Sequence, residues 1–191
     1  MPKKIKIGFD LDGVILYNPI RIFRPIVSHF NFLKPLLFHE NAESFYFPNS
    51  QIEKFVWKQL HKTSYKLAPG IEELKNFIKK NEIDAYIITS RYSFLKTDFE
   101  YWIQKMNAKS FLKNWFYNAE NEQPNAFKSK MIHKLKLDYF VEDNWGVIKK
   151  LNGSVKNTKI IWLSNILDKN IAYPYKCFNL KEVIRFFIKI V

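Results

Sequence analysis

Short apolar runs alternate with segments of helical spacing along most of this 191-residue chain. The apolar runs are too short for helices, whereas the segments between them carry apolar residues three and four positions apart. This alternation predicts an α/β fold, in which helices flank both faces of a parallel sheet. We expect strands at residues 5–9, 84–89, 115–117, 139–142 and 159–163, and helices at about residues 52–60, 71–80, 94–106, 125–137, 147–151 and 180–190.

Polar side chains stand at the ends of three of these strands. Asp10 and Asp12 follow the first strand, and Thr89 ends the second. Glu142 and Asp143 end the fourth. Because ligands of parallel α/β sheets bind beyond the carboxyl ends of the strands, these residues predict one functional site at that edge.

Asp10 and Asp12 form a paired-acid pattern. Carboxylates of alternate residues leave a strand on the same side. One can attack a phosphorus atom, while the other protonates the leaving oxygen and later deprotonates water. Gly13 lets the chain turn tightly and approach a ligand. The alternative is a strand end followed by an acidic turn, since a bare DxDG pattern arises by chance in roughly one chain of twenty.

The residues IGFDLDGVI resemble motif I of the haloacid dehalogenase (HAD) superfamily, whose pattern hhhhDxDGxh they match in full. The resemblance implies a Rossmann-like parallel sheet of strand order 3-2-1-4-5, Mg²⁺ as the cofactor, and phosphoryl transfer through an aspartyl-phosphate on Asp10. It also implies that Asp12 is the general acid/base and that its backbone carbonyl is a metal ligand.

Motif II of that family is an apolar strand ending in Thr or Ser, and AYIIT matches it. The resemblance implies that Thr89 is catalytic and hydrogen-bonds a phosphate oxygen. Ser90 is the adjacent alternative, and Arg91 is placed to add a bidentate phosphate contact.

Motif III is a lysine on the helix before the fourth strand, and both Lys128 and Lys130 qualify. They are two positions apart, about 200° around a helix, so only one of them can point at the site. We favour Lys128 as the catalytic lysine, because Leu135 and Leu137 then fall where the family usually has apolar residues. Lys130 is kept as an alternative in substrate binding.

Motif IV is an apolar strand ending in paired acids, and YFVED matches it. The resemblance implies a Mg²⁺ site formed by Asp10, Asp12 and Asp143, with Glu142 supporting it through water. Hard oxygen ligands are those that Mg²⁺ prefers. Converging carboxylates would also repel and raise one another's pKa unless a cation lay among them.

About fifty residues separate motif I from Pro69, at the place where the family inserts its helical C1 cap. We therefore expect a core of residues 1–15 and 68–191 and a cap of residues 16–67 that selects the substrate and excludes water. Its aromatic and arginine side chains could stack a base or grip a phosphate, although aromatics at helical spacing more often pack a core. They are Arg21, Phe23, Arg24, Phe30, Phe45, Tyr46, Phe47 and Trp57.

The small cap, DGV, the PG entry to the next helix, ITSR and the ED pair together resemble the 5'(3')-deoxyribonucleotidase group. This resemblance implies hydrolysis of nucleoside monophosphates. A sugar- or small-metabolite phosphatase would share every catalytic residue and differ only in the cap. A polynucleotide 3'-phosphatase or a nucleic-acid-binding protein of the superfamily is the third hypothesis.

The chain is strongly basic, with 31 Lys and Arg against 18 Asp and Glu and a net charge of +13. This favours phosphorylated or polyanionic partners. The lysines are scattered as KK and KxK pairs, and no RRM, zinc-finger or recognition-helix pattern occurs, so nucleic acid is the weaker expectation. Homodimerisation stays open.

A cytoplasmic protein without membrane contact is the expectation for location. The single Cys177 excludes a disulfide within the chain and fits a reducing compartment. Asp10 and Asp12 interrupt the apolar run near the N-terminus where a signal peptide would need it.

Overall fold

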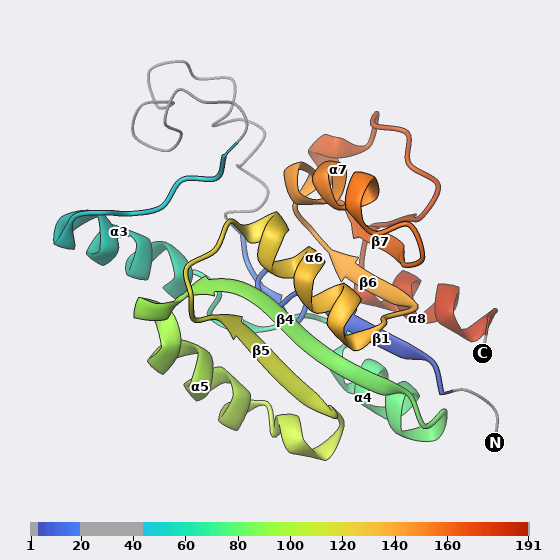
Figure 1. Ribbon diagram of the computed structural model, residues 1–191. Helices are drawn as coiled ribbons and strands as arrows, with labels where there is room; N and C mark the ends of the chain where they lie inside the picture. The colour runs from blue at the N-terminus through green and yellow to red at the C-terminus, as the bar shows by residue number, and fades with distance from the viewer. Residues whose placement is uncertain (1–3, 20–43, 191) are drawn as a thin grey trace.

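The computed structural model describes residues 4–19 and 44–190. Its centre is a six-stranded parallel sheet in the order β5-β4-β1-β6-β7-β8 (Figure 1). The strands are β1 (Lys6–Phe9), β4 (Asp84–Tyr92), β5 (Asn114–Asn118), β6 (Tyr139–Glu142), β7 (Lys159–Leu163) and β8 (Lys176–Cys177). The predicted α/β class is confirmed, and the five predicted strands take the order 3-2-1-4-5.

The sixth strand, β8, departs from that prediction. It is two residues long and pairs with the edge of β7, Trp162 opposite Lys176. The Lys176 ammonium donates to the carbonyls of Asp168, Lys169 and Ile171 at 2.6, 3.0 and 2.8 Å. The loop before β8 thus holds the strand in place. A strand of two residues is too short to show a hydrophobic period in the sequence, so the sequence did not predict it.

Helices cover both faces of the sheet (Figure 1). The buried side chains of α6 (Pro124–Leu135) and α7 (Trp145–Ser154) pack on one face. Those of α4 (Ile71–Lys80), α5 (Lys96–Lys105) and α8 (Leu180–Ile188) pack on the other. Short 3-10 helices span Ser93–Leu95, Ala108–Ser110 and Ile166–Asp168.

Strand β4 shows why both layers form. Ile87 packs in the cluster with α4, α5 and α8, while its neighbours Tyr86 and Ile88 pack with α6 and α7. Successive side chains of a strand point to opposite faces, so a continuous apolar run buries against two helical layers.

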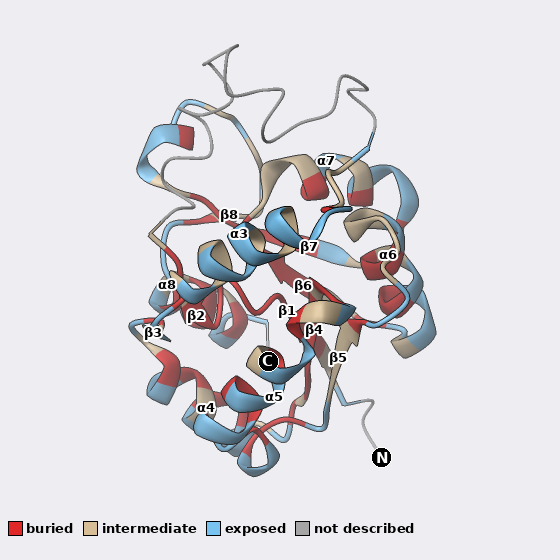
Figure 2. Ribbon diagram, turned by 90° about the vertical axis from the view of Figure 1, so that its left-hand side faces the viewer, coloured by how far each residue is buried: buried red, intermediate tan, exposed pale blue. Residues whose placement is uncertain are grey.

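Between β1 and α4 the chain makes an insertion, of which β2 (Leu16–Tyr17), α3 (Gln51–Lys62) and β3 (Lys66–Leu67) are described. β2 pairs antiparallel with β3, so the two ends of the insertion lie side by side. α3 has no buried residue, in contrast to the core helices (Figure 2). Four side chains named for the cap, Arg21, Phe23, Arg24 and Phe30, lie outside the described residues.

Across residues 4–19 and 44–190, no helix combines the length and the apolar character that crossing a bilayer requires.

Candidate active site

The two acids of motif I lie at the carboxyl end of β1, in the middle of the sheet. The Asp10 amide still donates to the carbonyl of Val141 on β6, at 2.9 Å, so the position of its side chain is set by the sheet. Gly13 then turns the chain with φ of +83°. A Cβ atom at this position would lie 2.3 Å from Asp143 Oδ2, so only glycine allows the motif I turn to approach the end of β6 so closely.

Three buried carboxylates converge where β1 and β6 end. Oxygen atoms of Asp10, Glu142 and Asp143 all lie within 4.8 Å of one another. The parallel pairing of Phe9 with Val141 brings them together, since it aligns the ends of the two strands. The structure thus joins acids that are more than 130 positions apart in the sequence.

Lys128 on α6 is the cation beside these acids. Its ammonium lies 2.5 Å from Glu142 Oε2 and 3.2 Å from Asp10 Oδ2, and its side chain is 3% exposed. Burial alone would lower the pKa of Lys128, but the neighbouring Asp10 and Glu142 carboxylates raise it above its ordinary value. Lys130 instead pairs with Glu122 at 2.7 Å on the surface, with its side chain 59% exposed, and is not brought into the site.

Burial and the neighbouring carboxylates change the pKa of Asp10. Burial raises it well above its ordinary value, and repulsion from Glu142 and Asp143 adds to the rise while Lys128 opposes it. Asp10 Oδ1 is buried and accepts no hydrogen bond from the described residues. A small set of buried, hard oxygen donors with excess negative charge fits a divalent cation such as Mg²⁺.

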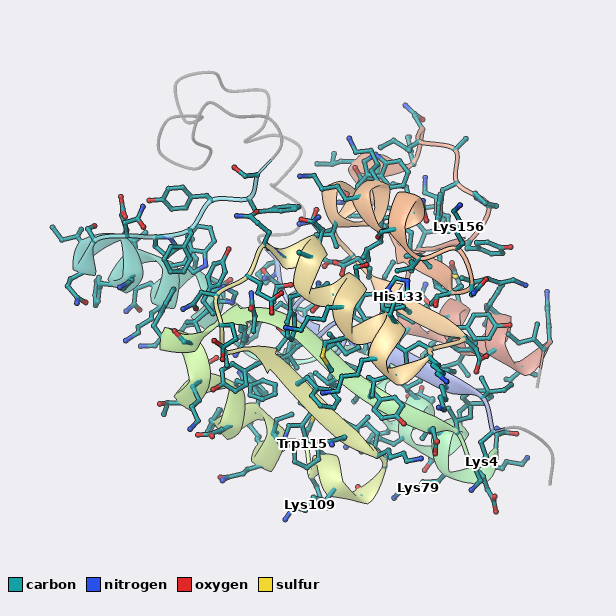
Figure 3. All side chains as sticks on the ribbon, in the orientation of Figure 1. Lys4, Lys79, Lys109, Trp115, His133 and Lys156 are labelled. Atoms are coloured by element: carbon teal, nitrogen blue, oxygen red, sulfur yellow. The ribbon has the colours of Figure 1, made fainter. Side chains whose placement is uncertain are left out.

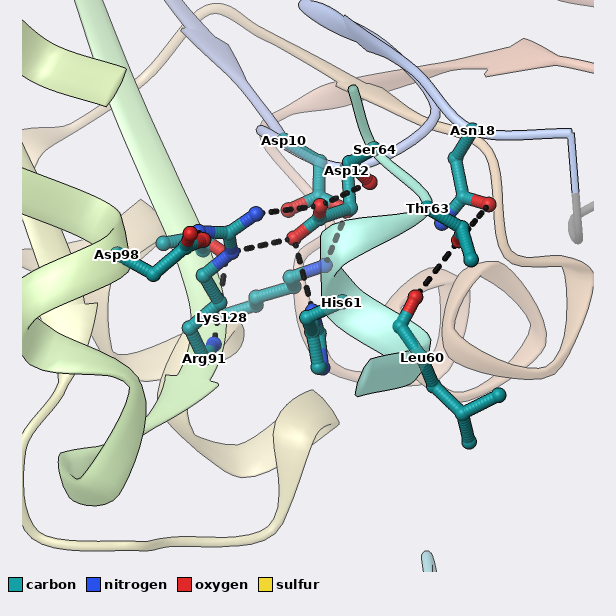
Figure 4. A network of polar contacts seen from close by, with 11 residues as sticks. Asp10, Asp12, Asn18, Leu60, His61, Thr63, Ser64, Arg91, Asp98 and Lys128 are labelled. Carbon is teal, nitrogen blue, oxygen red and sulfur yellow. Dashed lines mark hydrogen bonds and ion pairs between the residues drawn. The ribbon is translucent and has the colours of Figure 1, made fainter. Parts of the chain in front are cut away.

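Asp12 has different surroundings from Asp10, although only Leu11 separates them (Figure 4). Arg91 donates to both of its oxygens, from Nε to Oδ2 and from Nη2 to Oδ1, each at 2.8 Å. Ser64 Oγ donates to Oδ1 at 2.6 Å, and His61 Nδ1 lies 3.5 Å from Oδ2. Burial would raise the pKa of Asp12, but Arg91 and His61 lower it well below its ordinary value.

The motif II residues lie on β4, which continues to Tyr92. Thr89 is buried, and its hydroxyl accepts a hydrogen bond from the Arg91 amide at 3.3 Å. Ser90 faces elsewhere, with its hydroxyl 3.4 Å from the carbonyl of Pro124. Arg91 is directed at carboxylates, since its third nitrogen, Nη1, donates to Asp98 on α5.

Three residues around Asp12 are absent from the sequence-based site: His61, Ser64 and Asp98. His61 ends the amphipathic pattern of α3, Ser64 follows it, and Asp98 lies in the first turn of α5. None of them follows an apolar strand, which is the signal that located the other acids. Ser64 stands out because it is polar and only 1% exposed. Its burial can be seen only in the folded structure, so no signal for it was present in the sequence.

No protein-family model matches the sequence, and no curated protein matches it. Solved structures match it in fold. A HAD-superfamily hydrolase from Ehrlichia chaffeensis has a TM-score of 0.56 at 13% identity, over 99% of this chain and 98% of that chain. A predicted phosphatase from Clostridium acetobutylicum has a TM-score of 0.62 at 12% identity, over 97% and 99%.

CbbY from Rhodobacter sphaeroides, determined in complex with phosphate, has a TM-score of 0.60 at 12% identity, over 95% of this chain and 96% of that chain. A variant of CbbY has been determined with xylulose-(1,5)bisphosphate. The chain thus shares its fold with these proteins, among them a HAD-superfamily hydrolase and a predicted phosphatase.

Proposed function

We propose that this chain is a Mg²⁺-dependent phosphomonoester hydrolase that acts through an aspartyl-phosphate on Asp10. The observation that carries the proposal is the buried convergence of Asp10, Glu142 and Asp143 beside Lys128 at the carboxyl edge of the sheet. Three acids and one lysine at this edge suit the binding of a cation and a phosphate together. The fold shared with HAD-superfamily hydrolases supports the same class of reaction.

In the proposed reaction, the Asp10 carboxylate attacks phosphorus and the ester P–O bond breaks. Asp12, which must be protonated at this point against the lowering of its pKa by Arg91 and His61, gives that proton to the leaving oxygen. Asp12 then takes a proton from a water molecule, whose oxygen attacks phosphorus. The bond between phosphorus and Asp10 breaks, which releases inorganic phosphate and restores the carboxylate.

Thr89 and Lys128 are proposed to hold the phosphoryl group during both steps. The Thr89 hydroxyl would bind one phosphoryl oxygen, with Gly13 at the same edge of the sheet. Ser90 stays the alternative, although its hydroxyl lies near the carbonyl of Pro124. Lys128 would offset negative charge between nucleophile and phosphoryl group, which is where most of the catalysis of phosphoryl transfer arises.

Asp10, Asp143 and the backbone carbonyl of Asp12 are the proposed Mg²⁺ ligands, and Glu142 lies close enough to join or support them. When bound, the cation neutralises the converging carboxylates and the charge of the transferring phosphoryl group. We also propose a reducing, cytoplasmic location, supported by the lone and buried Cys177.

Residues 16–67 are proposed to form the substrate-selecting cap on a core of residues 1–15 and 68–191. The pairing of β2 with β3 supports this division, because it closes the insertion at its base. The contacts of His61 and Ser64 with Asp12 support it too, since they bring the end of the insertion to the proposed site.

Nucleoside monophosphates are the first proposed substrates, on the resemblance of the motif layout to the 5'(3')-deoxyribonucleotidase group. Sugar phosphates are the second, because CbbY, a neighbour in fold, has been determined with xylulose-(1,5)bisphosphate. Polynucleotides are the third proposed substrates, on the net charge of +13. Of the exposed lysines, Lys4, Lys79 and Lys109 line one surface hollow, whereas Lys156 lies away from them (Figure 3).

A phosphate-release screen over nucleotides, sugar phosphates and other phosphomonoesters tests the proposal, with Asp10→Asn as the blank. We expect Mg²⁺-dependent release that stops with EDTA, returns with added Mg²⁺ and is absent from the Asp10→Asn protein. Release by Asp10→Asn at the wild-type rate would contradict the nucleophile assignment.

Lys128→Met and Lys130→Met form a matched pair for the charge assignment. We expect the first to lose roughly 10²-fold or more in kcat, because a buried cation beside the nucleophile is removed, and the second to stay close to wild type. Equal and mild losses would remove Lys128 from the proposed role.

A further inference from the structure

Arg91 holds Asp12 with a two-point contact. The guanidinium gives Nε to one carboxylate oxygen and Nη2 to the other, both at 2.8 Å, and its side chain is fully buried. Two parallel hydrogen bonds of this kind stabilise the ion pair and also fix the orientation of the carboxylate. Lysine cannot reproduce this contact, because its ammonium is a point charge without a planar fork.

Arg91 is itself held from its outer side. Nη1 donates to Asp98 on α5, whose side chain is 31% exposed. Asp12, Arg91 and Asp98 therefore form a chain from the proposed site to a core helix (Figure 4). On the opposite side, Ser64 donates to Asp12 Oδ1 at 2.6 Å. The Asp12 carboxylate is thus fixed from the sheet and from the insertion.

The same geometry directs Arg91 toward carboxylates. All three guanidinium nitrogens donate to carboxylates, two to Asp12 and one to Asp98. The groups proposed to hold the phosphoryl group are others: the buried Thr89 on the same strand, and Lys128 on α6, which pairs with Asp10. Any effect of Arg91 on the reaction would therefore act through Asp12, whose carboxylate it holds.

We propose that Arg91 is a positioning residue: it fixes the carboxylate of Asp12 toward the ester oxygen and the attacking water, and Asp98 fixes Arg91. This goes beyond the proposed function, on which it rests, and replaces the bidentate phosphate contact expected for Arg91 from the sequence. In this proposal Arg91 takes no part in binding the phosphoryl group.

Leaving-group chemistry distinguishes the two roles. An alkoxide leaves phosphorus only with a proton, whereas p-nitrophenolate leaves without one. We expect Arg91→Lys to lower kcat/KM by about 10²-fold for the best alkyl phosphate of the screen, the lower end of what general acid–base catalysis contributes. For p-nitrophenyl phosphate kcat/KM stays within roughly 3-fold of wild type, because formation of the phosphoryl-enzyme needs no general acid.

The second half of the reaction gives an independent signature. Water attack still needs Asp12 with either substrate, so the Arg91→Lys protein should show a burst of p-nitrophenolate, about one per enzyme, before a slow steady state. Inorganic phosphate should bind the variant in the presence of Mg²⁺ as it binds the wild type. An equal fall of kcat/KM for both substrates, with weakened phosphate binding, would show a phosphate ligand and overturn the proposal.

A double-variant cycle tests whether Arg91 acts through Asp12. In an Asp12→Asn protein, adding Arg91→Lys should change the residual rate by less than about 2-fold, since residues that act as one unit are not additive. A full additional loss would overturn the positioning role.

Asp98→Asn repeats the test without altering Arg91, so the outcome does not depend on how well Arg91→Lys folds. It should reproduce the substrate-dependent loss in weaker form, and uniform losses would count against the proposal. Arg185→Lys, the same exchange at an exposed position of α8, is the matched control. If the wild type released no phosphate that depends on Asp10, the proposed function itself would fail, and this proposal with it.

Discussion

Buried charges meet at the carboxyl ends of β1 and β6, and they do not balance. Asp10, Glu142 and Asp143 place three carboxylates against the single ammonium of Lys128. Removing charges from water is expensive unless each is paired and hydrogen-bonded. Lys128 offsets part of this charge, and the proposed cation among the acids would offset more of it, whereas Asp12 is already paired with Arg91 and Ser64.

At the scale of single residues, Gly13 has little room for a side chain. We expect Gly13→Ala to lower the free energy of unfolding by roughly 1–3 kcal/mol, because φ of +83° is strained for alanine and the new Cβ would meet Asp143. The rate of phosphate release should fall as well, because the new Cβ would displace Asp143, a proposed Mg²⁺ ligand. Urea unfolding and phosphate release measure the two effects.

Gly153 supplies the control for that substitution. It lies on the exposed side of α7, and no atom lies within 4 Å of a Cβ built there. Gly153→Ala should leave stability unchanged or raise it by up to about 1 kcal/mol, since alanine favours helix. Equal effects of the two substitutions would contradict the close approach at Gly13.

At the scale of elements, α3 differs from every other described α-helix, because it buries none of its residues. Its beginning is secured locally by a capping box, in which Ser50 accepts from the Glu53 amide at 3.1 Å and Glu53 accepts from the Ser50 amide at 2.9 Å. Hydrogen bonds from the Ser50 amide, the Tyr46 hydroxyl and the Asn49 amide lower the pKa of Glu53 to about 2. The contribution of Glu53 is therefore present above pH about 4.5 and is lost as the pH falls toward about 2.

Ser50→Ala should destabilise α3 by about 1 kcal/mol, because a helix without buried contacts depends on its cap. The change should appear as faster hydrogen exchange of the α3 amides, with little effect on the amides of the central sheet. Ser154→Ala, at the end of α7, is the matched exchange. If α3 exchanged no faster in Ser50→Ala than in Ser154→Ala, the dependence on the cap would be wrong.

At the scale of the whole molecule, the proposed metal site joins two strands of the central sheet, so its occupation should stabilise the entire fold. A ligand at 100 times its dissociation constant adds about 2.7 kcal/mol. For a chain of this size we therefore expect Mg²⁺ to raise Tm by roughly 5–10 °C. Thermal unfolding with Mg²⁺ and with EDTA measures the shift.

Asp143→Asn should remove most of that increase, because it removes the proposed ligand that directly follows β6. Glu120→Gln, the same loss of a carboxylate at an exposed position, should keep the full increase. A Tm that did not respond to Mg²⁺ in the wild type would count against the cation site independently of any activity.

The α/β class was predictable from the sequence because it follows from local patterns, whereas the order of the five main strands was implied by the resemblance to the HAD motifs. Apolar runs of strand length and helical spacing are properties of neighbouring residues. The paired acids at the ends of β1 and β6 were also predictable as site residues. Polar residues at the carboxyl ends of buried parallel strands lie at the edge of the sheet where ligands bind. The motif resemblance named Asp10, Asp12 and Asp143 on this basis.

Only the tertiary structure decided what surrounds those acids. The choice between Lys128 and Lys130 depends on the rotation of α6 against the sheet, and the partners of Arg91 depend on how α5 and the insertion pack. Ser64 and Asp98 come from segments distant in sequence, and β8 depends on a loop held by Lys176. Local spacing determines which elements form, while contacts through space, set by packing, determine which side chains meet.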